Sequence, residues 1–223
     1  MTMPAPAWFV TGTDTEIGKT LAACALLHKL REKYPRVVGA KPVAAGLAPD
    51  GTNDDVARLR AASSLQVAPA LDNPYALPEP VSPHLAARAA RTQIDLQTID
   101  QAVQALRQQA DAVVVEGVGG FLVPLSDTED GGNLAHRLRL PVVLVVGLKL
   151  GCLNHALLTQ EAIASRGLPL AGWIASCVDP DMLRVDDNIA SLRARMRASC
   201  LGIIPHMSNP DPALAAQHLE LPA

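Results

Sequence analysis

The stretch from Trp8 to Thr20, WFVTGTDTEIGKT, predicts a strand, a phosphate-binding loop and the start of a helix. Its first three residues are large and apolar, as in a buried parallel strand. The next seven residues, 11–17, are rich in Thr, Asp and Gly and favour a loop. Gly18, Lys19 and Thr20 then open a helical apolar pattern made by Leu21, Ala22, Ala25, Leu26 and Leu30.

The residues that end this loop suit the phosphates of a nucleotide. Backbone amides at a helix N-terminus, together with the helix dipole, favour an anion. Gly18 lets the backbone approach closely, Lys19 supplies positive charge, and Thr20 offers a hydroxyl to magnesium. The usual spacing is G-x-x-x-x-G-K-[ST], but here Thr13 holds the first Gly position and Gly12 lies one residue earlier. The order of strand, loop and helix still predicts nucleotide binding rather than a chance G-K-T.

Length and composition predict one folded domain over residues 1–223. The chain is 49% hydrophobic and 18% charged, which argues against disorder, and its net charge of −3 with no basic block argues against a nucleic-acid partner. The longest apolar run, residues 140–148, is much shorter than the roughly 20 residues that cross a membrane, and residues 1–7 lack the features of a signal peptide. The four widely spaced cysteines predict buried, reduced thiols in a cytoplasmic protein, without zinc.

Short apolar runs alternate with helical patterns along the rest of the chain. Further strands are predicted at 37–40, 112–115, 141–146, 170–175 and 201–204, and helices at 56–62, 84–91, 94–109, 134–138, 156–165 and 182–197. Residues 44–53, 72–83 and 121–130 are predicted to be irregular, and residues 208–223 loosely structured or weakly helical. The alternation predicts an α/β fold, a P-loop NTPase-like parallel sheet with helices on both faces.

Several polar residues outside the loop are expected near it, because ligands bind beyond the carboxyl ends of parallel strands. Lys41 follows one predicted strand, although the pattern fits a solvated strand-end lysine equally well. Glu116 follows another predicted strand and precedes a predicted Gly-rich turn. Because its neighbours are apolar or small, a structural carboxylate would be poorly paired there, which favours a functional role for Glu116. Asp54 and Asp55 precede a helix, and either one of these acids caps that helix or one is a magnesium ligand. Gly151 precedes a further potential anion-binding helix start.

Taken together, these segments resemble the dethiobiotin synthetase family. The resemblance is carried by FVTGTDTEIGKT, VGAKPVAAG, NPYALPEPVSPH, VVEGVGGFLVPLSD, LPVVLVVGLKLGCLNHALLT and LAGWIA, and it weakens after about Val178. It implies a ligase of biotin biosynthesis that uses ATP, Mg²⁺ and CO₂ to convert 7,8-diaminononanoate to dethiobiotin. In that family a substrate amine captures CO₂ as a carbamate, and the γ-phosphate passes to a carbamate oxygen. The second amine then closes the cyclic urea, which releases phosphate and leaves ADP.

The resemblance also implies roles for matching positions. Lys41 and Lys19 would be catalytic, and Thr20, Asp55 and Glu116 would hold magnesium. The nucleotide would contact Glu16, Ile17, Gly18, Lys19, Thr20, Asp55, Glu116, Gly117, Val118, Gly119, Ser176, Cys177, Pro205, His206, Met207 and Asp211. The substrate would contact Thr15, Lys41 and Ala45 and, from the neighbouring subunit of a homodimer, Leu150, Gly151, Cys152, Leu153 and Asn154.

Two places depart from the family pattern. Ala45 stands where relatives can carry a Ser that helps to bind substrate, so a hydrogen bond is lost there or is made by water. Ser176 and Cys177 stand where relatives often carry Asn-Asp, which reads the adenine edge. A hydroxyl cannot reproduce the paired donor and acceptor of an amide. We therefore expect weaker selectivity for ATP over other triphosphates.

Three other interpretations remain open from the sequence. The chain could be another ATP-dependent ligase or amidase of the same loop class, such as a cobyrinate-diamide-type synthetase. It could be a switch ATPase of the chromosome-partitioning type, but those usually carry an early Lys in a K-G-G-x-G-K-T loop, and residues 13–16 contain none. A binding protein that has lost catalysis is suggested only by Ala45, Ser176 and Cys177.

Overall fold

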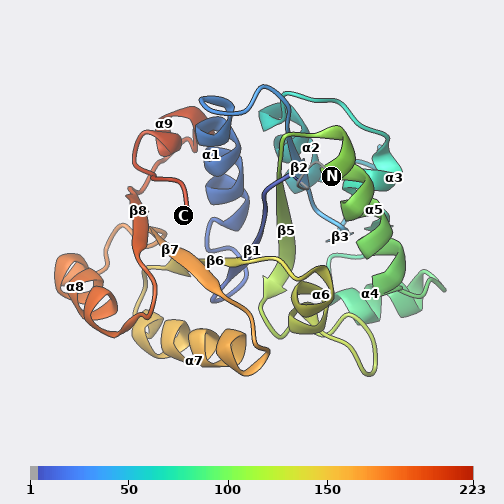
Figure 1. Ribbon diagram of the computed structural model, residues 1–223. Helices are drawn as coiled ribbons and strands as arrows, with labels where there is room; N and C mark the ends of the chain where they lie inside the picture. Colours follow the sequence, from blue (N-terminus) through green and yellow to red (C-terminus); the bar gives the residue numbers. More distant parts are fainter. Residues whose placement is uncertain (1–4, 223) are drawn as a thin grey trace.

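Six strands form one parallel sheet in the computed structural model, which describes residues 5–222 (Figure 1). The strand order is β2-β5-β1-β6-β7-β8, and every pairing is parallel. The strands are β1 (Ala7–Gly12), β2 (Val37–Ala40), β5 (Ala112–Gly120), β6 (Val142–Gly147), β7 (Leu170–Ser176) and β8 (Cys200–Ile204). The predicted parallel sheet is therefore confirmed, and its central strands are apolar because both faces are covered.

Helices cover both faces of the sheet, as predicted. Strand side chains alternate between the two faces, so that Val10 lies in one hydrophobic cluster and Phe9 in the other. The cluster around Val10 includes side chains of α1 (Lys19–Arg31), α2 (Asp54–Ala62) and α9 (Pro212–Ala216). The cluster around Phe9 includes side chains of α4 (Pro83–Ala89), α5 (Leu96–Gln109), α6 (Gly131–Leu138), α7 (Cys152–Ser165) and α8 (Val185–Arg195). Within residues 5–222, no helix has both the length and the apolarity needed to cross a bilayer.

The sequence predictions missed a second, small sheet. β3 (Val43–Ala45) pairs in parallel with β4 (Tyr75–Leu77), in two segments that were predicted to be irregular. The short helix α3 (Pro69–Asp72) leads into β4 and was not predicted either. Elements of three or four residues are too short to show a periodic pattern, so only their tertiary pairing reveals them.

Strand β5 is longer than predicted. The strand was predicted to end at Val115, with a turn after Glu116, but β5 continues to Gly120. The extension pairs with β1, where Val10 lies opposite Glu116 and Gly12 opposite Gly120. Glycines have low intrinsic strand propensity, and here pairing with the neighbouring strand outweighs it.

The C-terminal tail is more ordered than predicted. Ala215, Ala216 and Leu219 are buried, and α9 packs against α1. The backbone N–H of Glu220 donates to the carbonyl of Leu201 at 2.7 Å, which ties the tail to β8. A helix of five residues carries almost no periodic signal, so this docking depends on contacts that the sequence pattern does not show.

Candidate active site

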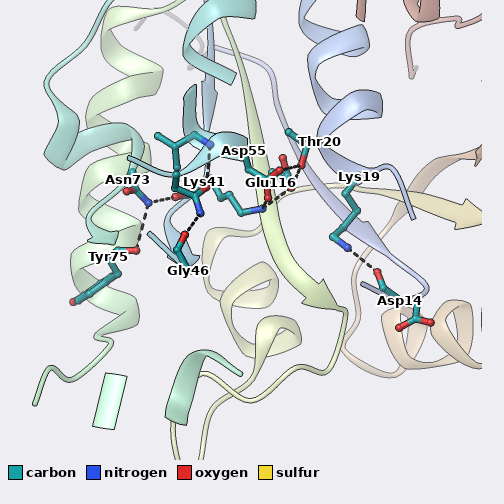
Figure 2. A network of polar contacts seen from close by, with 11 residues as sticks. Asp14, Lys19, Thr20, Lys41, Gly46, Asp55, Asn73, Tyr75 and Glu116 are labelled. Carbon is teal, nitrogen blue, oxygen red and sulfur yellow. Dashed lines mark hydrogen bonds and ion pairs between the residues drawn. The ribbon is translucent and has the colours of Figure 1, made fainter. Parts of the chain in front are cut away.

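The register of β2 and β5 brings Lys41 next to Glu116. Ala40, the last residue of β2, lies opposite Val115, so the residues that follow are neighbours at the sheet edge. Nζ of Lys41 lies 2.7 Å from Oε1 of Glu116 and 2.7 Å from Oδ2 of Asp55 (Figure 2). The interpretation of Lys41 as a solvated strand-end lysine is therefore wrong, because its side chain is 5% exposed and doubly paired.

Thr20 and Asp55 complete this group of polar side chains. The hydroxyl of Thr20, in the first turn of α1, lies 2.7 Å from Oδ1 of Asp55 and 2.9 Å from Oε1 of Glu116. Asp55 is free to reach this point because Asn53, and not an acid, caps α2, its side chain accepting from the N–H of Val56. Thr20, Lys41, Asp55 and Glu116 form what we call the cation cluster.

Charges in the cation cluster stabilise one another. Burial alone would lower the pKa of Lys41, but the carboxylates of Glu116 and Asp55 outweigh it and hold that pKa above its usual value. Burial would raise the pKa of Asp55, yet the Lys41 ammonium outweighs it and holds that pKa below its usual value. Glu116 is fully buried, and its second oxygen, Oε2, has no hydrogen-bond partner among the residues described. A buried carboxylate oxygen without a partner is suited to a further cation.

The packing around the phosphate-binding loop favours glycine at position 12, one residue before the usual first glycine of the motif. A Cβ atom on Gly12 would lie 2.8 Å from Cδ1 of Ile17 and 2.9 Å from Cδ of Lys19, so a side chain there would push into the loop. Gly18, the residue before α1, has a left-handed φ of 80° that favours glycine. A Cβ atom on Gly18 would also lie 2.6 Å from Oγ of Ser176 at the end of β7. The two glycines thus allow the loop to fold closely against the sheet edge.

Lys19 points along the loop rather than into the cation cluster. Its Nζ donates to the carbonyl of Asp14 at 2.7 Å, as Figure 2 shows. Burial lowers the pKa of Lys19 to about 8, which Glu116 only partly offsets. The carboxylate of Asp14 in turn pairs with Lys149, which lies just after β6 and whose Nζ is 2.8 Å away. No role was predicted for Asp14 or Lys149, although Lys149, like Lys41, lies near the carboxyl end of a strand.

A cleft of about 840 Å³ runs along these groups at the carboxyl ends of the strands. Most of the predicted site residues line it: Thr15, Glu16, Ile17, Gly18, Lys19, Thr20, Lys41, Ala45, Asp55, Glu116, Val118, Gly119, Ser176, Cys177, His206 and Met207. The cleft is also lined by residues to which no role was predicted, namely Leu21, Arg58, Pro80, Val81, Ser82, Pro83, Val123, Val178 and Pro210. The local sequence pattern does not mark residues 80–83 as site residues; they follow β4, which pairs with β3.

Other predicted site residues lie outside the residues that line the cleft. Gly117 faces the core, where an added Cβ would lie 2.9 Å from Cζ of Phe9. Pro205 is exposed, and Asp211 caps α9, its side chain accepting from the N–H groups of Ala213 and Leu214. The nucleotide roles of these three residues stay predictions.

The segment from Leu150 to Asn154 also lies apart from the cleft of its own chain. Leu150 is 96% exposed, Gly151 has a φ of 96°, and Cys152 is buried in the first turn of α7. Leu153 and Asn154 continue that turn. All four cysteines are free, but only Cys24 and Cys152 are buried as predicted, whereas Cys177 and Cys200 are half-buried.

Known proteins resemble this chain over almost its whole length. The model of a family described as "AAA domain" matches residues 7–213. The ATP-dependent dethiobiotin synthetase BioD of Aromatoleum aromaticum is 56% identical, over 97% of this chain and 97% of its own length. The protein of the same name from Ralstonia nicotianae is 58% identical, over 96% of this chain and 94% of its own length.

Solved structures of similar shape support the fold class. The MinC:MinD cell division protein complex of Aquifex aeolicus has a TM-score of 0.57 at 15% identity, covering 92% of this chain and 82% of that one. A ParA family ATPase of Chlorobium tepidum has a TM-score of 0.55 at 14% identity, covering 95% of this chain and 90% of that one. At these identities the likeness shows the P-loop NTPase fold alone. The identity to the curated relatives is far higher, and the chain belongs to the dethiobiotin synthetase family.

Proposed function

We propose that this chain carboxylates and cyclises 7,8-diaminononanoate to dethiobiotin, using CO₂ and ATP and releasing ADP and phosphate. The observation that carries the proposal is the cation cluster, in which Lys41, Asp55 and Glu116 meet Thr20 of the phosphate-binding loop. It lies in a cleft large enough for a nucleotide and a small substrate, in a chain that is 56% identical, over 97% of its length, to an ATP-dependent dethiobiotin synthetase.

The cation cluster fits a magnesium ion. Thr20, Asp55 and Glu116 offer the oxygen donors that magnesium prefers, and Oε2 of Glu116 has no other partner among the described residues. Within residues 5–222, no three His, Cys, Asp or Glu side chains group so as to hold a metal unaided. Magnesium usually takes one or two carboxylates and completes its ligands with phosphates and water. The ion would neutralise charge on the β- and γ-phosphates.

The phosphate-binding loop would hold the polyphosphate against this cluster. Amides from Glu16 to Thr20 lead into α1, whose N-terminus favours an anion. The Nζ of Lys19 would move from the carbonyl of Asp14 to the phosphates. It would exchange a neutral carbonyl oxygen for charged phosphate oxygens. The base would extend past Ser176 and Cys177 toward His206 and Met207, which line the far part of the cleft.

The chemistry would proceed in three steps. A substrate amine attacks CO₂ and loses a proton, which gives a carbamate. A carbamate oxygen then attacks the γ-phosphorus, the bond to the β–γ bridging oxygen breaks, and ADP leaves. The second amine attacks the carbamoyl carbon, the phosphate leaves with the carbamate oxygen, and the ring closes with loss of a proton. Lys41 would bind carbamate and phosphoryl oxygens during transfer, where charge neutralisation and positioning provide most of the catalysis.

The substrate would bind between two subunits. Thr15, Ala45 and the apolar wall of Pro80 and Val81 line the cleft next to Lys41 and suit an aliphatic diamine. The amides from Leu150 to Asn154 of a neighbouring subunit would receive the substrate carboxylate. The nearly complete exposure of Leu150 supports this arrangement, because a large apolar side chain held in solvent is suited to an interface. The active form would then be a homodimer.

One assay separates this function from the alternatives. ADP formation should require 7,8-diaminononanoate, bicarbonate and Mg²⁺ together, and omission of any one should reduce it to background. ADP formation that is instead stimulated by DNA, by membranes or by a protein partner would favour a switch ATPase. Turnover with another amine or carboxylate but not with this diamine would favour a different ligase of the same loop class.

A further inference from the structure

Lys41 pairs with the two carboxylates that a divalent cation would need, and we infer that Lys41 is a movable counter-ion whose release depends on the metal. In this arrangement the ammonium stays between Asp55 and Glu116 until a divalent cation takes those carboxylates. The displaced ammonium then turns toward the phosphoryl group. The inference deepens the proposed function of the same site and rests on it.

The first argument is that both cations would pair with the same two carboxylates, Asp55 and Glu116. Oε1 of Glu116 accepts from Nζ of Lys41 at 2.7 Å and from the hydroxyl of Thr20 at 2.9 Å. Oδ2 of Asp55 accepts from Nζ of Lys41 at 2.7 Å, and Oδ1 of Asp55 lies 2.7 Å from the Thr20 hydroxyl, whose single hydrogen bonds to one of the two carboxylates at a time. An ammonium and a divalent ion on the same two carboxylates would repel each other strongly in a buried site. This repulsion favours release of one of them, and the carboxylates attract the doubly charged ion more strongly than the singly charged ammonium.

The second argument is that the Lys41 side chain can move while its backbone stays fixed. The N–H of Lys41 donates to the carbonyl of Asp72 at 2.8 Å. The side chain of Asn73 donates to the carbonyl of Lys41 at 2.6 Å (Figure 2). These bonds hold the main chain on both sides of the Cα atom of Lys41. The four-carbon side chain lines the cleft and can rotate into it.

The counter-ion role predicts an order of events at the site. Nucleotide without a divalent cation would leave Lys41 on the carboxylates, so the catalytic ammonium would not face the phosphates. Metal entry would fill the carboxylate pair and free Lys41 in the same exchange. Lys19 would not take part, because its Nζ is bound to the carbonyl of Asp14 and not to either carboxylate.

The first experiment measures Mn²⁺ binding without nucleotide, by the electron paramagnetic resonance signal of free Mn²⁺. Lys41→Met keeps most of the side-chain length and removes the charge. We expect it to bind Mn²⁺ at least about tenfold more tightly than the wild type, because no internal cation competes for the carboxylates. The matched control is Lys149→Met, which removes an ammonium from Asp14, outside the cluster, and should stay within about twofold of the wild type. Equal or weaker Mn²⁺ binding by Lys41→Met overturns the inference.

A second measurement uses the wild-type protein and does not depend on a variant that folds. Acetic anhydride labels accessible lysines, and mass spectrometry of peptides compares Lys41 with the exposed Lys33. Saturating Mg²⁺, without nucleotide, should raise the labelling of Lys41 relative to Lys33 several-fold. Unchanged labelling overturns the inference.

Neither readout requires turnover, so the two hypotheses can fail separately. If both readouts respond but diamine-dependent ADP formation is absent, the counter-ion role stands and the proposed reaction falls. If turnover is normal but Mn²⁺ affinity and labelling do not change, the reaction stands and the counter-ion role is overturned.

Discussion

Nζ of Lys41 lies 2.7 Å from Oε1 of Glu116, although the two residues are 75 positions apart in the chain. Both side chains are almost completely removed from solvent, at 5% and 0% exposure. A buried ion pair of this kind is weak support for stability by itself, because desolvation offsets most of the attraction. Its position beside Thr20 and a nucleotide-sized cleft instead supports the catalytic role proposed for Lys41.

Lys41→Ala should abolish turnover and leave the fold intact. Diamine-dependent ADP formation should fall about a hundredfold or more, because the transferring phosphoryl group loses a positioned cation. The variant should also unfold more easily, by roughly 3 kcal/mol, because Glu116 would stay buried without its positive partner. Steady-state kinetics and a circular dichroism melt measure the two effects. Near-normal rates in a folded variant would remove Lys41 from the mechanism.

Nucleotide binding without metal should weaken above neutral pH. The pKa of Lys19 is lowered to about 8, so the charge that attracts phosphates is present below that pH and is lost above it. In EDTA, the affinity for ADP should fall about tenfold between pH 7 and pH 9, as the protonated fraction declines. Calorimetric titration at several pH values measures this. The side chain of the Lys19→Arg variant stays charged over this pH range, so the affinity of that variant for ADP should not change with pH. An equally steep decline in the variant would assign the effect to another group.

Gly18→Ala should damage the nucleotide site beyond ordinary backbone strain. Gly51 is a matched control, because its φ of 81° is almost that of Gly18 at 80°, yet an added Cβ there meets nothing within 4 Å. Each substitution should cost about 1 kcal/mol of folding stability through the left-handed backbone. Only Gly18→Ala should lower ATP affinity, about tenfold, because its Cβ would lie 2.6 Å from Oγ of Ser176. Equal ATP affinity in the two variants would mean that the loop tolerates a side chain at this point.

The wild-type protein should discriminate weakly between nucleoside triphosphates. Ser176 and Cys177 line the part of the cleft assigned to the base, and a hydroxyl cannot offer an amide's paired donor and acceptor. Ser176→Asn should raise the preference for ATP over CTP and GTP by about tenfold, the worth of one good hydrogen-bond pair. Side-by-side values of kcat/KM with the three nucleotides test this. Strict adenine choice by the wild type would contradict the expectation.

Much of this site could be predicted from the sequence, because its residues follow local rules. Gly18, Lys19 and Thr20 stand where a strand, loop and helix must meet, and Lys41 stands at the carboxyl end of a parallel strand. The pairing of Lys41 with Glu116 depends on the register of β2 and β5, which the sequence pattern does not specify.

Features set by longer-range contacts were not predictable in this way. The ion pair between Asp14 and Lys149 joins two loops that only the sheet order brings together. The pairing of β3 with β4, which places Pro80 and Val81 at the cleft, involves strands of three residues. Such short elements form because neighbouring segments hold them, and their own residues give little indication of it.

The most direct test of the account follows oxygen from CO₂ into phosphate. If a carbamate oxygen attacks the γ-phosphorus and later leaves with it, single-turnover reactions with C¹⁸O₂ should place one ¹⁸O atom in each phosphate released and one in the cyclic urea. Rapid quenching limits exchange of the label with water, and mass spectrometry reads both products. Phosphate without ¹⁸O, formed together with labelled dethiobiotin, would mean that the carbamate is not phosphorylated and would contradict the role given to Lys41 and the cation cluster.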